Sequence, residues 1–208
     1  MTDTCVIFAG GDPVKAETVD KSLLENAFII CADKGFALAE SLAVEADIVL
    51  GDFDSLNYTP KGDKVICFPP EKDDTDLMLA VNKALEIGAK KIVIYGACGG
   101  RIDHMIGNIA CLALIAENSA SGTIVGDDDI ISFHMPSEFS VPYKEGFSLS
   151  LFAYSHEVKG LAISGAKYSV QDCTLTDSVT LGVSNEIIPP SANISFTEGR
   201  LLVIQSRL

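Results

Sequence analysis

The first 120 residues alternate short apolar runs with segments of helical periodicity, and this alternation limits the possible folds more than any other feature of the sequence. The apolar runs cover residues 5–9, 28–32, 47–50, 65–68 and 91–95. Helix-like segments cover residues 14–26, 36–42, 75–87 and 102–117. Strands that alternate with helices are typical of a parallel sheet covered by helices on both faces. We therefore predict an N-terminal α/β domain with a mostly parallel sheet over residues 1–120.

The pattern changes near residue 120. Short extended segments follow, among them residues 148–153, 179–182 and 201–205, and glycine, proline, asparagine and serine separate them. This part of the sequence has no helical period. Several short strands with turn signals between them are typical of a small antiparallel sandwich or barrel. Residues 118–122 are the expected boundary, and residues 121–208 are predicted to form a second, all-β domain.

The composition argues against two kinds of partner. A formal net charge of −14 and an isoelectric point near 4.4 give a surface that repels a phosphate backbone, so we expect no nucleic-acid binding. No apolar run approaches the roughly 20 residues of a membrane-spanning helix. The sequence begins Met-Thr-Asp-Thr, without the basic segment of a secretory signal, and its six cysteines lack metal-ligand spacing. We expect a cytoplasmic protein with reduced cysteines.

Two carboxylates follow the third apolar run directly, in the segment Gly51-Asp52-Phe53-Asp54-Ser55. In open α/β sheets, ligand sites form beyond the carboxyl ends of the strands. Asp52 and Asp54 on a tight turn can converge on one hard cation, and oxygen ligands suit Mg²⁺. The alternative for this segment taken alone is a solvated acidic turn.

A second acidic cluster, residues 71–76, lies between the fourth apolar run and the helix predicted after it. Asp76 is placed to join the two earlier aspartates around a metal ion, and Lys72 supplies a positive charge beside bound phosphates. Helix capping is the alternative role, since carboxylates at a helix N-terminus are common. Capping accounts for one or two of these acids, not for four within six positions.

The third cluster, residues 96–104, follows the fifth apolar run and precedes the last helix of the first domain. Gly99 and Gly100 allow the backbone to approach a phosphate closely, and the helix N-terminus adds favourable electrostatics. Arg101 can form bidentate contacts with phosphate oxygens. The segment is neither a GxGxxG loop nor a Walker P-loop, so an ordinary strand-to-helix turn is the alternative, with His104 as a surface residue.

All three clusters are expected at the same edge of one sheet, because each follows a strand of the same parallel domain. Arginine, lysine and several aspartates without a nucleophile triad fit phosphoryl transfer, where positioning and charge neutralisation provide most of the catalysis. The residues and their spacing therefore predict a metal-assisted enzyme that acts on phosphates.

The sequence resembles the thiamin pyrophosphokinase family. The segments that carry the resemblance are Ala32-Asp33-Lys34-Gly35, Gly51-Asp52-Phe53-Asp54-Ser55, Lys72-Asp73-Asp74-Thr75-Asp76, Gly99-Gly100-Arg101-Ile102-Asp103-His104 with Gly107-Asn108, Gly160-Leu161, Tyr168 and Gly182-Val183-Ser184-Asn185-Glu186. Their order and spacing extend over almost the whole chain. The resemblance implies an α/β domain followed by a β-sandwich, and a homodimer with active sites between the subunits. It also implies that ATP donates pyrophosphate to the hydroxyl of thiamin and leaves as AMP, with Mg²⁺ required.

The resemblance also implies roles for individual residues. It assigns Mg²⁺ and the pyrophosphate to Asp52, Asp54 and Asp76; ATP to Asp33, Lys72, Gly99, Gly100, Arg101 and His104; catalysis to Asp52, Asp54, Asp73, Asp76, Arg101 and Asp103; and thiamin to Ser184 and Asn185. Asp73 or Asp103 is the candidate to assist the hydroxyl as a base. Lys34 departs from the frequent Asp-Gly-Gly of the family and either contacts a phosphate or points to solvent. The chain has no tryptophan, so Tyr168 and Phe196 are the aromatic candidates beside thiamin, each with a core position as its alternative.

Two other functions use the same features. One is a Mg²⁺-dependent phosphohydrolase that uses the same aspartates with water as the acceptor. The other is a non-catalytic nucleotide sensor with the β domain as an interaction module. A hydrolase has no need of a thiamin pocket, and a sensor has no need of so many carboxylates.

Overall fold

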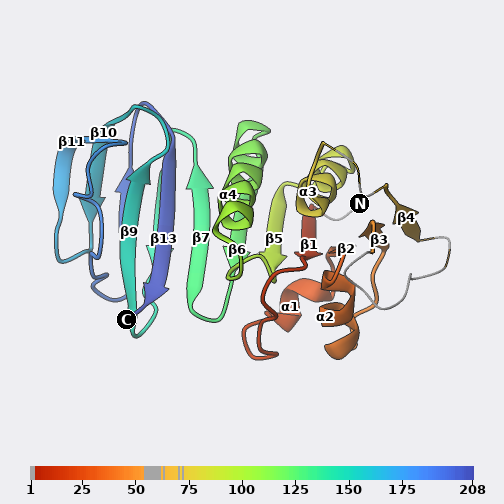
Figure 1. Cartoon of the computed structure of the whole chain (residues 1–208). Coiled ribbons are helices and arrows are strands. Elements are labelled where there is room, and N and C mark those ends of the chain that lie inside the picture. Colours follow the sequence, from red (N-terminus) through yellow and green to blue (C-terminus); the bar gives the residue numbers. More distant parts are fainter. Residues whose placement is uncertain (1–2, 54–61, 63, 70, 72) are drawn as a thin grey trace. The chain divides into compact units, whose positions relative to one another are not determined.

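The computed structural model describes residues 3–53, 62, 64–69, 71 and 73–208 (Figure 1). The chain divides into two compact units, Met1–Asp127 and Asp128–Leu208. The division falls after the strand Ser121–Val125, because that strand pairs in parallel with Lys91–Tyr95 of the first unit. No helix in the described part of the chain is long and apolar enough to cross a membrane.

The first unit is built on parallel strands in the order β4-β3-β2-β1-β5-β6. Their bounds are β1 Thr4–Phe8, β2 Phe28–Ala32, β3 Ile48–Gly51, β4 Val65–Cys67, β5 Lys91–Tyr95 and β6 Ser121–Val125. The chain starts at β1, adds β2, β3 and β4 on one side, and then returns to place β5 on the other side of β1. Consequently the order of the strands reverses between β1 and β5.

The helices of this unit are α1 Lys21–Leu24, α2 Gly35–Ser41, α3 Asp76–Glu86 and α4 Ile102–Glu117. Leu38 and Ala39 of α2 pack with Val6 and Phe8 of β1 in one apolar cluster. The helix expected over residues 14–26 is wrong in length, because only Lys21–Leu24 is helical. Turns occupy the preceding residues, and the side chain of Asp20 begins the helix by accepting a hydrogen bond from the Ser22 N–H at 3.0 Å.

The second unit consists of antiparallel strands. They are β7 Asp129–His134, β8 Glu138–Pro142, β9 Phe147–Ala153, β10 Glu157–Ser164, β11 Val170–Thr176, β12 Ser191–Ser195 and β13 Leu201–Arg207. Strand β13 lies between β7 and β9, and a separate sheet has the order β11-β10-β12-β8. Leu149 and Val203 from the first set share an apolar core with Leu161 and Ile194 from the second. The predicted combination of a parallel α/β part and a β-sandwich is therefore confirmed.

One expected strand of the second unit is absent. Residues 179–182 form a turn between β11 and β12, not a strand. The Val183 N–H donates to the Thr180 carbonyl at 3.2 Å, which closes the chain on itself. Gly182 also packs against β9, where a Cβ atom would overlap the Leu151 carbonyl oxygen. Sequence hydrophobicity suggested a strand here, but Val179 and Leu181 are exposed by 44% and 71%.

Candidate functional site

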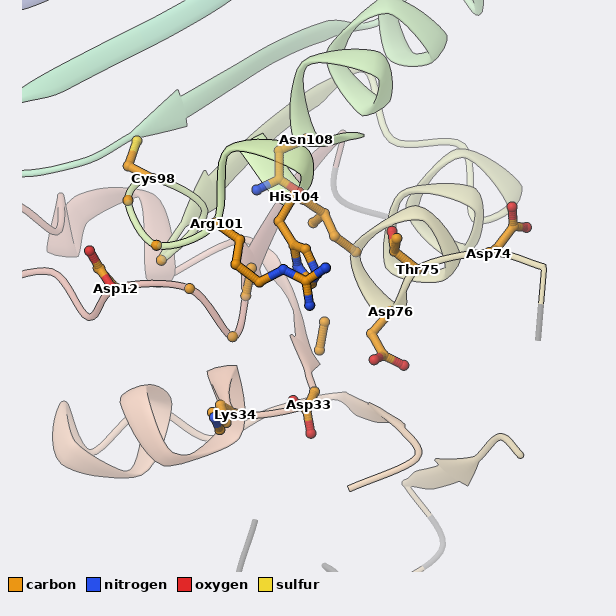
Figure 2. A pocket seen from close by; sticks show the side chains of 18 of the residues that line it. Asp12, Asp33, Lys34, Asp74, Thr75, Asp76, Cys98, Arg101, His104 and Asn108 are labelled. Atoms are coloured by element: carbon orange, nitrogen blue, oxygen red, sulfur yellow. The ribbon is translucent and has the colours of Figure 1, made fainter. Parts of the chain in front are cut away.

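A cavity of about 750 Å³ lies at the carboxyl edge of the parallel sheet in the first unit (Figure 2). This volume is in the usual range for small-molecule and cofactor sites. Its walls come from the loops after β1, β2, β3 and β5 and from the first turns of α3 and α4. The lining residues are Ala9, Gly10, Gly11, Asp12, Ala32, Asp33, Lys34, Asp52, Asp73, Asp74, Thr75, Asp76, Leu77, Gly96, Cys98, Gly99, Gly100, Arg101, His104 and Asn108.

Glycines hold the loops after β1 and β5 together. The Gly11 N–H donates to the Gly96 carbonyl at 2.7 Å, and the Asp12 N–H donates to the Cys98 carbonyl at 3.2 Å. A Cβ atom on Gly11 would stand 2.6 Å from the Gly96 oxygen, and one on Gly96 would stand 2.6 Å from the Ala9 oxygen. Only glycine permits this approach, so the two loops form one continuous wall of the cavity.

The loops after β2 and β3 are also in close contact. Asp33 has a left-handed backbone with φ of 48°, which aspartate adopts more readily than most residues. Its N–H donates to the Leu50 carbonyl at 2.9 Å. A Cβ atom on Gly51 would approach the Asp33 Cα to 3.2 Å, so glycine at this position lets Asp33 lie against the end of β3. The result places Asp33 and Asp52 on neighbouring loops of one cavity.

The carboxylates predicted from sequence gather at this cavity as far as the structure describes them. Asp33, Asp52, Asp73 and Asp76 line it. Thr75 accepts a hydrogen bond from the Met78 N–H at 3.2 Å and so caps α3, which leaves Asp76 in the first turn of that helix. Asp54 and Lys72 lie outside the described residues.

The donor chemistry of these aspartates fits Mg²⁺, since carboxylate oxygens are its usual protein ligands. Among the residues that the structure describes, no three histidine, cysteine, aspartate or glutamate side chains form a metal-binding group. The described carboxylates therefore supply suitable donors around the cavity without forming a complete cage.

Arg101 is the arginine of the cavity, and a carboxylate orients it. Arg101 Nε donates to Asp103 Oδ1 at 3.0 Å, and the Arg101 Nη2 atom also contacts Asp103. This pairing lowers the pKa of Asp103 to about 2 and raises the pKa of Arg101. Asp103 itself is not among the lining residues. A carboxylate with so low a pKa is a weak proton acceptor, so its contact with Arg101 is its clearest contribution to the site.

The start of α4 borders the same cavity. Arg101 occupies the N-cap position, and its side chain forms no capping hydrogen bond. Asn108, about two turns further along, donates from Nδ2 to the Ala97 carbonyl at 2.8 Å and so ties α4 to the loop after β5. His104 lines the cavity from the first turn of the helix. Gly99 and Gly100 have φ values of 76° and 67°, a conformation that glycine adopts without strain.

Sequence reasoning overlooked the loop after β1. Gly10, Gly11 and Asp12 line the cavity, and none of them was among the predicted site residues. The signal was present, because a Gly-Gly-Asp segment directly after a buried strand falls at the same edge as the other clusters. Lys34 also lines the cavity, and the residue is exposed.

The two residues assigned to thiamin lie in the second unit, and both form hydrogen bonds within it. The Asn185 side chain accepts hydrogen bonds from the N–H groups of Tyr168 at 3.0 Å and Glu186 at 2.9 Å, and donates to the Tyr168 carbonyl at 2.9 Å. The residue is 7% exposed. The Ser184 N–H donates to Ser150 Oγ at 3.1 Å. Asn185 therefore fixes the backbone on which Tyr168 is displayed.

The two aromatic candidates differ in exposure. Phe196 is 4% exposed and belongs to the core of the second unit, whereas Tyr168 is 61% exposed. Lys167 lies over the Tyr168 ring at 5.7 Å and forms an ion pair with Glu186 at 2.8 Å. Of the two aromatic side chains, only Tyr168 is accessible to a ligand.

Comparison with known proteins gives the same family for both parts of the chain. The family model for the thiamin pyrophosphokinase catalytic domain matches residues 19–132, and the model for the thiamin pyrophosphokinase vitamin B1 binding domain matches residues 132–201. A thiamine pyrophosphokinase from Bacillus subtilis is 30% identical over 210 residues, which are 98% of this chain and 98% of that protein.

Solved structures agree over the full length. The crystal structure of thiamine pyrophosphokinase from Bacillus subtilis is similar with a TM-score of 0.85 and 29% identity, and covers 98% of this chain and 99% of that chain. The enzyme from Geobacillus thermodenitrificans gives 0.84 and 29%, with 99% and 98% covered. Thiamin pyrophosphokinase from Candida albicans, at 16% identity and a TM-score of 0.80, shares the fold and covers 100% of this chain and 90% of that chain.

Proposed function

Because the chain belongs to the thiamin pyrophosphokinase family, we propose that it transfers the pyrophosphoryl group of ATP to the hydroxyl of thiamin in a Mg²⁺-dependent reaction. The products are thiamin diphosphate and AMP. The observation that carries this proposal is the cavity at the carboxyl edge of the sheet, where aspartates from separate loops face Arg101 and the glycines after β5. Positive charge and close backbone approach suit the phosphates of ATP.

The aspartates that would hold Mg²⁺ are Asp52, Asp54 and Asp76. The bound ion would neutralise charge between the phosphate oxygens, which is its general contribution to phosphoryl transfer. Arg101 binds phosphate oxygens with its planar guanidinium, and Asp103 keeps that guanidinium in place. Gly99 and Gly100 let the backbone of the loop approach the phosphates, and Asp33, Lys34, Lys72 and His104 complete the proposed nucleotide site.

The reaction forms one bond and breaks one. The hydroxyl oxygen of thiamin bonds to the β-phosphorus of ATP, and the bond from that phosphorus to the oxygen bridging the α-phosphorus breaks, so that AMP leaves with this oxygen. We assign the hydroxyl proton to Asp73, which lines the cavity, whereas Asp103 is held by Arg101 with its pKa lowered to about 2. Positioning of the two substrates supplies most of the rate in such a reaction.

Thiamin binding is proposed for the second unit, together with assembly into a homodimer whose active sites lie between subunits. The family model for vitamin B1 binding supports the first part, since it includes Ser184 and Asn185. Exposed apolar side chains support the proposed homodimer. Ile102 and Ile106 of α4 are exposed by 79% and 60%, and isoleucines on one helix face are typical of surfaces that associate.

The proposed location is the cytoplasm, which agrees with six cysteines that form no disulfide.

The test is to incubate the protein with ATP, Mg²⁺ and thiamin and to measure AMP and thiamin diphosphate together. We expect the two products in equal amounts, with neither formed when thiamin is omitted. Thiamin monophosphate, whose hydroxyl is already esterified, is the matched control and should give no AMP. Inorganic phosphate released without thiamin would instead indicate a phosphohydrolase. Tight ATP binding with no turnover would indicate a nucleotide sensor.

A further inference from the structure

The point at which the strand order reverses lies between β1 and β5. In open α/β sheets, ligands bind in the crevice outside the carboxyl ends of the strands at such a reversal. The residues at this crevice are those of the loop after β1, which includes Asp12, and of the loop after β5, which includes Gly99 and Arg101. The topology therefore directs a nucleotide over the loop that sequence analysis overlooked.

The two loops fix the position of Asp12. Its N–H donates to the Cys98 carbonyl, and the preceding Gly11 is held by Gly96. The Asp12 carboxylate extends beside Gly99, where a Cβ atom would overlap Asp12 Oδ2. Glycine at position 99 is therefore needed both for its positive φ and for the space that the carboxylate fills.

The Asp12 carboxylate is a hydrogen-bond acceptor at the cavity wall. No described residue donates a hydrogen bond or forms an ion pair with it in the structure. Figure 2 shows Asp12 at one end of the cavity, whereas Asp74 and Asp76 lie at the other, with Arg101 between them. A carboxylate at this end repels phosphates and attracts a ligand group that carries hydroxyl or amino donors.

From this arrangement we propose that Asp12 recognises the ribose hydroxyls of the nucleotide, so that ATP lies with its nucleoside over the loops after β1 and β5 and its phosphates toward Arg101 and the aspartates. The ribose is the part of ATP directly next to the phosphates, and Asp12 contacts a residue only two positions before Arg101. The two adjacent hydroxyls of ribose match the two oxygens of one carboxylate. This inference rests on the proposed function for the identity of the nucleotide.

The experiment measures equilibrium binding of ATP, 2′-deoxy-ATP, 3′-deoxy-ATP and inosine triphosphate by calorimetry in the presence of Mg²⁺. Wild-type protein should bind ATP about 10-fold to 100-fold more tightly than at least one deoxy analogue, as expected for hydrogen bonds to a charged group. Asp12→Ala should bind ATP and that analogue about equally, and Asp12→Asn should show an intermediate ratio. Asp3→Ala removes an exposed aspartate of the same unit outside the cavity and should keep the wild-type ratio.

The possible outcomes separate this inference from the proposed function. The inference is overturned if every preference for ATP over a deoxy analogue survives in Asp12→Ala, and also if the wild-type protein shows no such preference. Loss of discrimination against inosine triphosphate, instead of the deoxy analogues, would mean that Asp12 contacts the base and would also overturn it. If Asp12-dependent discrimination is present but no thiamin diphosphate forms, the inference stands and the proposed reaction fails. Absence of nucleotide binding would overturn both.

Discussion

The two units of the chain use their polar residues in different ways. In the first unit, the candidate side chains extend from loops at the edge of a parallel sheet, and the core beneath them is apolar. In the second unit, the candidate Asn185 is buried, and its side chain holds the backbone of the segment to which it belongs. The first arrangement places the candidate side chains apart from the core, whereas in the second the candidate side chain itself forms stabilising hydrogen bonds. Substitutions in the two units should therefore have different consequences.

Asp52→Asn gives the largest expected effect on function with the least effect on folding. The amide has the size of the carboxylate but lacks the negative charge of the proposed Mg²⁺ ligand. We expect kcat to fall at least about 100-fold, a loss typical of removing one electrostatic contact in an active site. The melting temperature should change little. Steady-state kinetics and thermal unfolding measure the two quantities, with Asp3→Asn as the control for a lost surface charge. Near-normal turnover would contradict the metal assignment, and the same assay applies to Asp54→Asn.

Gly35→Ala should have the opposite outcome in the same unit, because it affects the scaffold under the site. A Cβ atom on Gly35, the first residue of α2, would overlap the Phe8 carbonyl oxygen of β1. Since the atoms that this Cβ would meet belong to the backbone of Phe8 and Ala9, relief requires α2 to move away from the sheet. We expect the free energy of unfolding to fall by about 3 kcal/mol, at the upper end for overpacking.

The matched control for Gly35→Ala is Gly107→Ala in α4, where a new Cβ atom would meet no atom within 4 Å. Alanine favours the helix by up to about 1 kcal/mol over glycine, so this variant should be at least as stable as wild type. Chemical denaturation measures both. Equal stability of the two alanine variants would show that the approach of α2 to β1 is not as close as the structure has it.

The same difference between the units explains how far sequence reasoning reached. Parallel strands are buried on both faces and read as continuous apolar runs, so β1, β2, β3 and β5 were predicted close to their observed bounds. Because their carboxyl ends share one edge, the convergence of Asp52, Asp76 and Arg101 at one cavity also followed from the pattern, whereas Asp33 was assigned only through the family resemblance.

Other features depend on contacts that no local pattern encodes. The segment 179–182 has the hydrophobicity of a strand but forms a turn, because Gly182 packs against the backbone of β9. Asn185 is a polar residue of a type that often binds ligands, yet its side chain forms hydrogen bonds with Tyr168, 17 positions away. Asp12 follows a Gly-Gly pair whose meaning depends on the loop after β5, more than 80 positions further along the chain. In each case, contacts with residues far away in the sequence determine the role of the residue or segment.

Asn185→Ala tests whether one side chain of the second unit contributes both to stability and to thiamin binding. Truncation leaves the N–H groups of Tyr168 and Glu186 and the Tyr168 carbonyl without their side-chain partner. We expect the free energy of unfolding to fall by about 2 kcal/mol. The KM for thiamin should rise while the KM for ATP stays near its wild-type value, since the site assigned to ATP lies in the other unit.

Tyr168→Ala is the companion variant. It should raise the KM for thiamin without the loss of stability, because the Tyr168 ring is exposed. A normal KM for thiamin in both variants would separate this segment from substrate binding.

The smallest expected effect appears only in acid and concerns His134 of β7. Burial lowers the pKa of His134 to about 4, compared with an ordinary value near 6.5, and its ring stacks on Phe139 at a centroid distance of 3.6 Å. Between these two values the unfolded chain binds a proton that the folded chain does not. The stabilisation from the neutral ring is therefore complete above about pH 6.5 and is lost as the pH falls toward 4. After allowance for partial exposure of the ring, we expect a loss of about 2 kcal/mol over this range.

His134→Phe keeps the stacked ring but cannot titrate, so it should remove this part of the acid sensitivity. Chemical denaturation of wild type and variant at several pH values between 7 and 4 gives the free energy of unfolding of each. In the difference between the two values, contributions from the carboxylates that both proteins share cancel. His156→Phe is the matched control, because that histidine is in the same unit and its side chain is 86% exposed. If the stability of His134→Phe depends on pH as that of wild type does, the acid sensitivity comes from the carboxylates. His134 then contributes nothing to the difference between the two units. If His134→Phe alone flattens the profile, a buried titratable group in the second unit acts on stability, whereas the candidate titratable groups of the first unit line its cavity.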